Sequence, residues 1–317
     1  MDRNLFHICS DCGSIFSEFK EAYDFFPEIF HSGWLIAILL SLVGVLIVTR
    51  NQIFIGAAIT QTSTFGIAIA LYILGLDAMS DATGQAKQDL ILKYSIISAT
   101  VCTIWAFVSK TGTLSFLRKL KLSVAVSKET SKKYREDITG WLFLLSSAGA
   151  IVLLSNSPLG KEEIDKLIFS TIIGADSADV QLLLYLVIVT LVLLFIFLDK
   201  ITLVFTDRDY AVSIKLPATR FEFFFAILAG VVLGTCLKIS GTLYSFGCLI
   251  LPVLIAANLC KSIRLLFVLS PIIALLFAFL GFASGNFYDI PQTQLTVFFM
   301  SIFYPLSLFY KSIFIRN

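Results

Sequence analysis

The chain has 317 residues, of which 57% are hydrophobic and 15% are charged, and its formal net charge is +2. A mean hydropathy of +0.89 is too apolar for an ordinary soluble domain and indicates a polytopic integral membrane protein. The sequence lacks ten-residue segments of alternating hydropathy. We therefore expect an all-α helical bundle that contacts the lipid bilayer and has no nucleic-acid partner.

Residues 1–31 are predicted to form an N-terminal segment outside the cytoplasm. Its first residues lack the basic-then-apolar order of a cleavable signal, so we expect the segment to be retained. His7, Cys9 and Cys12 either capture a metal, pair as a disulfide between the two cysteines, or have no ordered role. Apolar residues at helical spacing predict a helix that lies on the outer membrane surface or packs against the bundle; they are Ile15, Phe16, Phe19, Tyr23 and Phe26.

Apolar runs between charged residues predict about nine transmembrane helices, because each run can cross a hydrocarbon core of about 30 Å. We expect them to form one transmembrane domain over residues 32–317. The predicted spans cover residues 32–49, 54–75, 94–110, 141–156, 181–198, 222–238, 242–260, 264–284 and 293–310.

The basic residues of the predicted loops set the orientation, because basic loops stay in the cytoplasm. The most basic loop, residues 110–135, lies between the third and fourth spans. Placing it inside also places Arg50 and the basic residues of 200–220, 261–264 and 311–316 inside. The outer loops are then acidic or neutral, the N-terminus is outside and the C-terminus is cytoplasmic.

Five consecutive residues of the second span have polar side chains: Thr60, Gln61, Thr62, Ser63 and Thr64. A hydroxyl in a membrane helix commonly donates to a carbonyl of its own helix or to a neighbouring helix, which needs no ligand. Five polar positions in a row nevertheless encircle the helix, so some would face lipid if the helix were peripheral. We therefore expect a central helix, with one side along a translocation pathway.

Motifs for covalent catalysis do not occur in the sequence. It has no GxxxxGK[ST] phosphate loop, no HExxH and no GxSxG, and its only histidines are His7 and His31. The chain is therefore predicted to be a transport subunit and not an enzyme. If ATP drives the transport, its hydrolysis must take place on another polypeptide.

Six collinear segments resemble motifs of the permease subunit of the zinc/manganese/iron family of bacterial ABC importers. GAAITQTSTFG at 56–66 resembles the family's GDALSHAxLPG, and EDITG at 136–140 resembles EDxxxG. FSTIIGADSADV at 169–180 resembles FGxILGVSxxDL, and FYDIPQT at 287–293 resembles YxLDLPSG.

Two further segments carry the most specific resemblance. FTDRDYAVSIKLP at 205–217 resembles the cytoplasmic FDPEYARALGLP of the family. ISGTLYSFGCLILPVLIAA at 239–257 resembles VGxLLVxALLILPAAxA. The six segments together extend over most of the chain.

The resemblance implies a permease dimer of the bacterial cytoplasmic membrane that imports a divalent zinc, manganese or iron ion by alternating access. Its partners would be cytoplasmic ATP-binding subunits and an extracytoplasmic metal-binding receptor protein. ATP would bind to the partner subunit, and this chain would bind no cofactor.

A short cytoplasmic helix, by position Thr206 to Lys215, would transmit the motion of the ATPase. Its coupling residues would be Thr206, Asp207, Arg208, Asp209, Tyr210 and Ala211. Carboxylates suit the positive end of a helix, although a solvated loop is the alternative. Lys215 stands where the family often has glycine, so the helix exit is expected to differ.

The resemblance fails at the residues that would hold the metal, because Ala57 and Gln61 replace the family's Asp and His. Amide and hydroxyl oxygens are weaker donors to these metals than carboxylate or imidazole, so the metal ligands are unknown. Either a second, different permease chain supplies the ligands, or a homodimer uses other donors such as Cys236 and Cys248, or the substrate has changed.

The predicted lining of the pathway combines the polar stretch with two positions of the seventh span. It consists of Ala57, Thr60, Gln61, Thr62, Ser63, Thr64, Cys248 and Pro252. Pro252 removes a backbone donor, and the resulting kink either frees a carbonyl for water or a cation or serves packing alone.

Two other classes of protein are possible for a chain of this composition. An ion-coupled secondary transporter normally has charged residues inside its spans, and here they are nearly absent. A scaffold that transports nothing has no need for the polar run in the second span.

Overall fold

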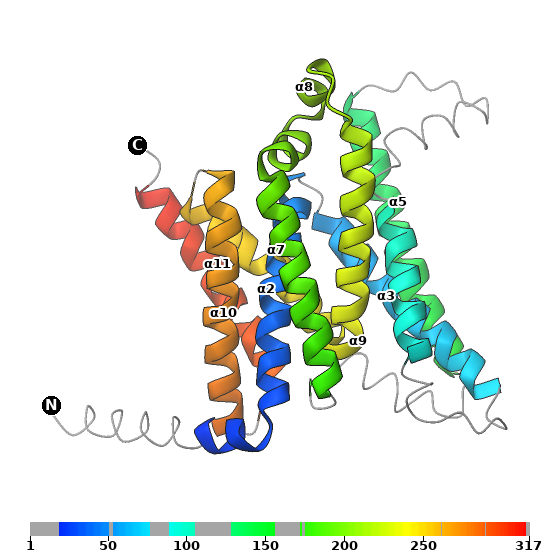
Figure 1. Cartoon of the computed structure of the whole chain (residues 1–317), viewed down its shortest axis with the longest axis vertical. Coiled ribbons are helices and arrows are strands. Elements are labelled where there is room, and N and C mark those ends of the chain that lie inside the picture. Colours follow the sequence, from blue (N-terminus) through cyan, green and yellow to red (C-terminus); the bar gives the residue numbers. More distant parts are fainter. Residues whose placement is uncertain are drawn as a thin grey trace, which may run out of the picture.

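Helices make up almost all of the computed structural model, which confirms the predicted all-α fold (Figure 1). The structure describes residues 19–50, 53–76, 89–104, 128–155, 172, 175–260, 262–288 and 290–314, and no strand occurs in these ranges. His7, Cys9, Cys12, Ile15 and Phe16 lie outside the described residues, and so does the basic loop up to residue 127.

The principal helices follow one another along the chain with short connections. They are α2 (Pro27–Thr49), α3 (Ile53–Leu76), a helix over residues 89–104, α5 (Lys128–Ser155), α7 (Ser177–Thr206), α8 (Arg208–Ser213), α9 (Ala218–Leu259), α10 (Ile263–Phe287) and α11 (Gln292–Phe314). In the described part of the chain, six helices are long and apolar enough to cross a membrane: α2, α3, α7, α9, α10 and α11. The number of nine spans stays a prediction.

Helix α9 is one continuous element of 42 residues, interrupted at Gly241. An unbroken helix of that length would be about 63 Å long, roughly twice the hydrocarbon thickness. Gly241 has φ 73° and ψ −179°, a conformation that is essentially restricted to glycine. The predicted spans 222–238 and 242–260 lie on the two sides of this break. Pro252 lies within the second half of α9, and Gly241 is the residue with non-helical backbone angles.

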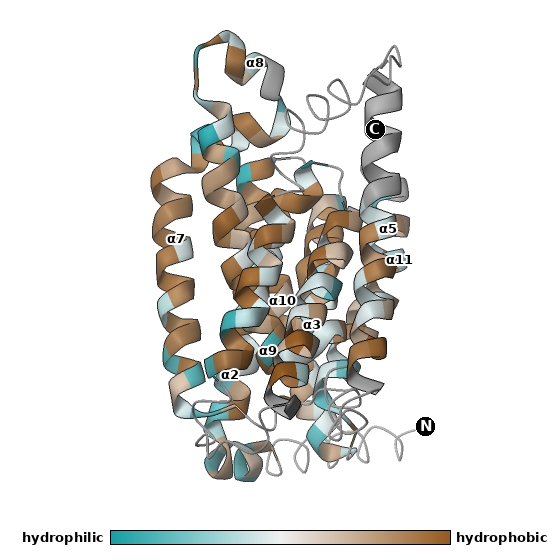
Figure 2. Cartoon of the chain, turned by 90° about the vertical axis from the view of Figure 1, so that its right-hand side faces the viewer, coloured by the Kyte–Doolittle hydropathy of each residue, from teal (hydrophilic) through white to brown (hydrophobic). Residues whose placement is uncertain are grey.

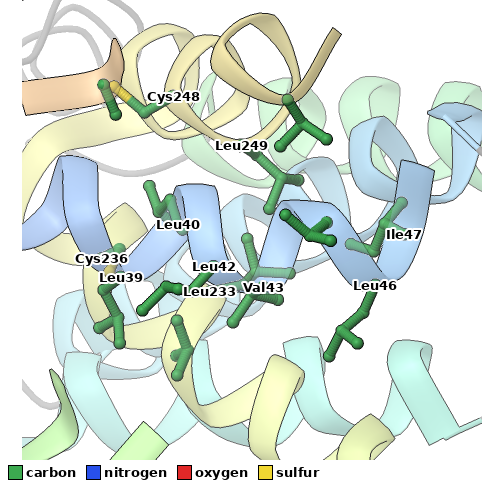
Figure 3. Close-up of a cluster of buried hydrophobic side chains, with 14 of the residues drawn as sticks. Leu39, Leu40, Leu42, Val43, Leu46, Ile47, Leu233, Cys236, Cys248 and Leu249 are labelled. Atoms are coloured by element: carbon green, nitrogen blue, oxygen red, sulfur yellow. The ribbon is translucent and has the colours of Figure 1, made fainter. Parts of the chain in front are cut away.

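Helix α2 occupies the centre of the bundle and contacts α7, α9 and α10. Of its most apolar window, 72% is buried, whereas the corresponding value for α7 and for α11 is 22%. Figure 3 shows side chains of α2 packed against both halves of α9. The labelled members of this core cluster are Leu39, Leu40, Leu42, Val43, Leu46, Ile47, Leu233, Cys236, Cys248 and Leu249.

The outward surface of the bundle is apolar, as the brown ribbon of α7 shows (Figure 2). Tyr185 and Phe195 of α7 have exposed fractions of 68% and 88%. Such a surface is unsuited to water, but it suits acyl chains or another hydrophobic subunit. The chain is therefore a multi-pass membrane protein.

Segments predicted to be cytoplasmic gather at one end of the bundle, the end at which α8 projects (Figure 1). The Arg264 guanidinium of α10 lies 2.9 Å from the Asp199 carboxylate of α7. Near the end of α11, Lys311 Nζ donates to Asn258 Oδ1 of α9 at 3.4 Å. The relative placement of these loops agrees with the orientation inferred from charge, and the side of the membrane stays a prediction.

The short helix over residues 19–25 packs against the bundle. Its Phe19 ring lies 5.2 Å from the ring of Phe30 and 5.3 Å from that of Phe279, measured between centroids. The Tyr23 hydroxyl and His31 Nε2 are 3.0 Å apart and form a hydrogen bond. For the described residues, the packing alternative is therefore the one observed.

The contact at Gly44 should be intolerant of any side chain. A Cβ built at this position would lie 1.8 Å from the carbonyl oxygen of Leu249, which is backbone and cannot move aside cheaply. We expect Gly44→Ala to destabilise the protein by about 1–3 kcal/mol, as overpacking does. The thermal unfolding midpoint of purified protein would measure this loss.

Gly140 of α5 supplies the matched control, because no atom lies within 4 Å of a Cβ built there. Gly140→Ala should stabilise the helix by about 0.5–1 kcal/mol. Equal effects of the two substitutions would contradict the role assigned to Gly44.

Candidate translocation and coupling sites

The polar stretch lies on the inner side of α3. Thr60, Ser63 and Thr64 are buried, whereas Gln61 and Thr62 are half-buried. Helix α3 contacts both α5 and α9. Most of the polar positions therefore face protein, which accounts for their presence in an otherwise apolar helix.

The hydroxyl groups of the stretch are satisfied largely by their own helix. Thr60 donates to the carbonyl of Ala57 at 2.8 Å, and Thr62 donates to that of Ala58 at 2.7 Å. Thr64 donates to the carbonyl of Thr60 at 3.0 Å. These hydroxyls are stable without any ligand, as expected for threonine in a membrane helix.

Gln61 differs from its neighbours, because its side chain makes no hydrogen bond among the residues that the structure describes. An amide carries two donors and an acceptor with two lone pairs, and leaving them unpaired in an apolar setting is costly. Gln61 is therefore the residue of this stretch whose polar group is available to a water molecule, a cation or a second chain.

A chain of hydrogen bonds joins three helices beside the polar stretch. Ser95, on the helix over residues 89–104, donates to the carbonyl of Gly234 at 2.7 Å. The Ser63 hydroxyl lies 2.8 Å from Ser95 Oγ and is therefore the donor of that pair. The three groups connect α3, the 89–104 helix and the first half of α9.

Glycines allow these helices to approach each other closely. A Cβ at Gly230 would lie 2.4 Å from Thr100 Cα, and one at Gly234 would lie 2.7 Å from Ile96 Cα. A Cβ at Gly66 would lie 2.6 Å from the Tyr94 carbonyl oxygen. Gly230 and Gly234 form a GxxxG pattern, the usual sequence signal for such a crossing, and attention to it would have identified this contact.

The two cysteines considered as metal ligands lie in the apolar core (Figure 3). Cys236 and Cys248 are both fully buried, among leucines of α2 and α9. In the described ranges, no three His, Cys, Asp or Glu residues are placed so that they could hold a metal ion. The assignment of Cys248 to the pathway stays a prediction.

The segment after α7 is a helix, α8, and not a loop. Asp207 caps it: the Asp207 Oδ1 atom accepts a hydrogen bond from the Tyr210 backbone N–H at 3.1 Å. Ala211 is buried on the inner side. Tyr210, Val212 and Ile214 have exposed fractions of 55%, 53% and 48%. A projecting helix with exposed aromatic and aliphatic side chains has the character of a docking surface.

A family model for the ABC 3 transport family matches residues 22–311. The chain belongs to the ABC 3 transport family. The residues that carried the sequence resemblance thus identified the family correctly. This permease is accordingly a membrane subunit of an ABC importer.

Solved structures share the fold of this ABC 3 permease. It is similar to a structure of PsaBC from Streptococcus pneumoniae in complex with Fab, with a TM-score of 0.70 and 18% identity over 92% of this chain and 95% of that chain. It is also similar to an inward-facing conformation of a metal-chelate type ABC transporter, with a TM-score of 0.63 and 17% identity over 90% of this chain and 85% of that chain. Among curated proteins there is no match.

In this ABC 3 permease, lysine takes the backbone conformation that glycine would adopt at the exit of α8. Lys215 has φ 62°, which is left-handed, and among the described non-glycine residues it alone has a positive φ. The Leu216 N–H donates to the Ala211 carbonyl and the Lys215 N–H donates to the Val212 carbonyl, both at 3.0 Å. This is a Schellman ending, so the expected difference in the helix exit does not occur.

Lys215→Gly should therefore relieve strain at the end of α8. A left-handed conformation costs an ordinary residue about 1–2 kcal/mol, so we expect stabilisation of about 1 kcal/mol, measured as a higher thermal unfolding midpoint. Lys200→Gly, inside α7, is the control and should destabilise by about 1 kcal/mol. Stabilisation by both substitutions, or by neither, would contradict this interpretation of Lys215.

Proposed function

We propose that this permease is one half of the membrane channel of an ATP-driven importer for a divalent transition metal ion, such as zinc, manganese or iron. It would work in a bacterial cytoplasmic membrane with a separate ATP-binding subunit, an extracytoplasmic metal-binding receptor protein and a second permease chain. Family membership supports the transport class, and the description of one similar structure as a metal-chelate type transporter supports the cargo.

The observation that carries the proposal is the geometry of α8. It is a capped helix of six residues, held by α7 on one side and α9 on the other, and it projects beyond the end of the bundle (Figure 1). A short helix held at both ends follows its partner as a rigid body, so motion of an ATPase would reach α7 and α9 directly. An ion-coupled carrier has no use for such a surface.

Tyr210 should be central to the contact with the ATP-binding subunit, because aromatic side chains dominate such interfaces. We expect Tyr210→Ala to weaken the association by about tenfold or more, which corresponds to roughly 1.4 kcal/mol. The measurement is the dissociation constant for the purified ATPase subunit. Tyr185→Ala, an equally exposed tyrosine on the apolar face of α7, should leave it unchanged. Unaltered binding by Tyr210→Ala would reject α8 as the docking helix.

A heterodimer explains the absent metal ligands best. Ala57 and Gln61 offer no carboxylate or imidazole, and burial of Cys236 and Cys248 in the core withholds their thiols from a pathway. We therefore infer that a different permease chain supplies the carboxylate and imidazole, while the Gln61 amide contributes a neutral oxygen to the same path. Weak neutral donors favour release, which transport requires.

Gln61 and Thr64 should respond differently to loss of their polar groups. Gln61→Leu should lower uptake of Mn²⁺ or Zn²⁺ into proteoliposomes by about tenfold, because it removes the one amide of the stretch that is not already bonded. Thr64→Val should change uptake little, since the Thr64 hydroxyl bonds only to the Thr60 carbonyl of its own helix. Normal uptake with Gln61→Leu in an intact complex would reject the pathway position.

A further inference from the structure

The structure contains a buried ion pair next to α8 that the proposed function has not used. Arg50, at the end of α2, lies with Nη2 2.5 Å from Oε1 of Glu222 in α9. The exposed fractions of the two side chains are 7% and 1%. Their sequence positions are 172 residues apart, so the contact arises only from the fold.

The same guanidinium also lies against α7. Arg50 Cζ is 4.2 Å from the centroid of the Phe205 ring, and Phe205 is the penultimate residue of α7. The Phe205 ring in turn meets Phe225 of α9 edge-on, with 6.0 Å between centroids. Arg50 therefore inserts between the two helices that carry α8, and contacts both of them.

The position of Arg50 in the sequence extends this connection to the polar helix. Only residues 51 and 52 separate Arg50 from Ile53, where α3 begins, and α3 holds Thr60 to Thr64. A displacement of α8 that moves Phe205 or Glu222 must therefore move the Arg50 guanidinium or break its contacts. Through the backbone, that movement reaches the start of α3 directly.

Stability alone does not explain two charges in this position. Burying a charge carries a large desolvation penalty, and an apolar pair of similar volume is often at least as stable. What the ion pair and the cation–π contact add is direction, because they fix the three helices in one register.

We propose that Arg50 and Glu222 are positioning residues that transmit the motion of α8 to α3 and so couple ATP hydrolysis to opening of the pathway. This inference rests on the proposed function. It assigns to a specific side-chain contact the step between the docking helix and the polar stretch.

The test uses the double variant Arg50→Met/Glu222→Leu in the complete transporter in proteoliposomes. Removing both charges together avoids an unpaired buried charge, which would threaten folding by itself. We expect the number of Mn²⁺ or Zn²⁺ ions imported per ATP hydrolysed to fall about fivefold or more. Co-purification of the ATPase subunit and the thermal unfolding midpoint should match those of the wild type.

The matched control is the ion pair of Asp199 and Arg264 at the same end of the bundle, whose side chains are 78% and 71% exposed. Asp199→Asn/Arg264→Gln should leave the number of ions per ATP unchanged, because exposed pairs contribute little. The exchanged variant Arg50→Glu/Glu222→Arg should recover part of the ratio lost in the apolar variant, since it restores the attraction between α2 and α9.

An unchanged ratio in the assembled apolar double variant would overturn the inference while leaving the proposed function intact. Wild-type protein that neither binds an ATPase subunit nor imports either ion would instead overturn the proposed function, and this inference with it.

Discussion

Close contact between helix backbones at glycine is the constraint on which the arrangement of this permease depends. Inside a bilayer, apolar side chains gain nothing by leaving lipid for protein, so association relies on dense packing and on interhelical hydrogen bonds. Gly44 brings α2 against the backbone of Leu249, and Gly230 and Gly234 bring α9 against the 89–104 helix. Both halves of α9 are thereby held, on either side of its break at Gly241.

This packing determines what the polar residues can do. Because α3 is pressed against its neighbours, the hydroxyls of Thr60, Ser63 and Thr64 are buried and bonded within protein. They contribute to structure, and the chemistry available for transport is concentrated in the half-buried amide of Gln61. A pathway lined by neutral groups binds a cation weakly, which is consistent with a division of labour between two different permease chains.

The charged residues act at the end of the bundle rather than within it. Arg50 joins α2 to α7 and α9 where those two helices carry α8, and it directly precedes α3. The docking helix, the ion pair and the polar helix therefore form one continuous mechanical connection. Alternating access by movement of rigid helices requires such a connection between the ATPase and the pathway.

Several features followed from local sequence, because hydropathy and capping are properties of single segments. Apolar runs located the long helices, Asp207 indicated the start of α8, and six motifs identified the family. Which partner each group would find depended on the fold. Nothing near Lys215 in the sequence shows that the packing of α8 holds it in a left-handed conformation, and nothing near Arg50 indicates Glu222. Those contacts join groups from different segments, so only the tertiary structure, which brings the segments together, could decide them.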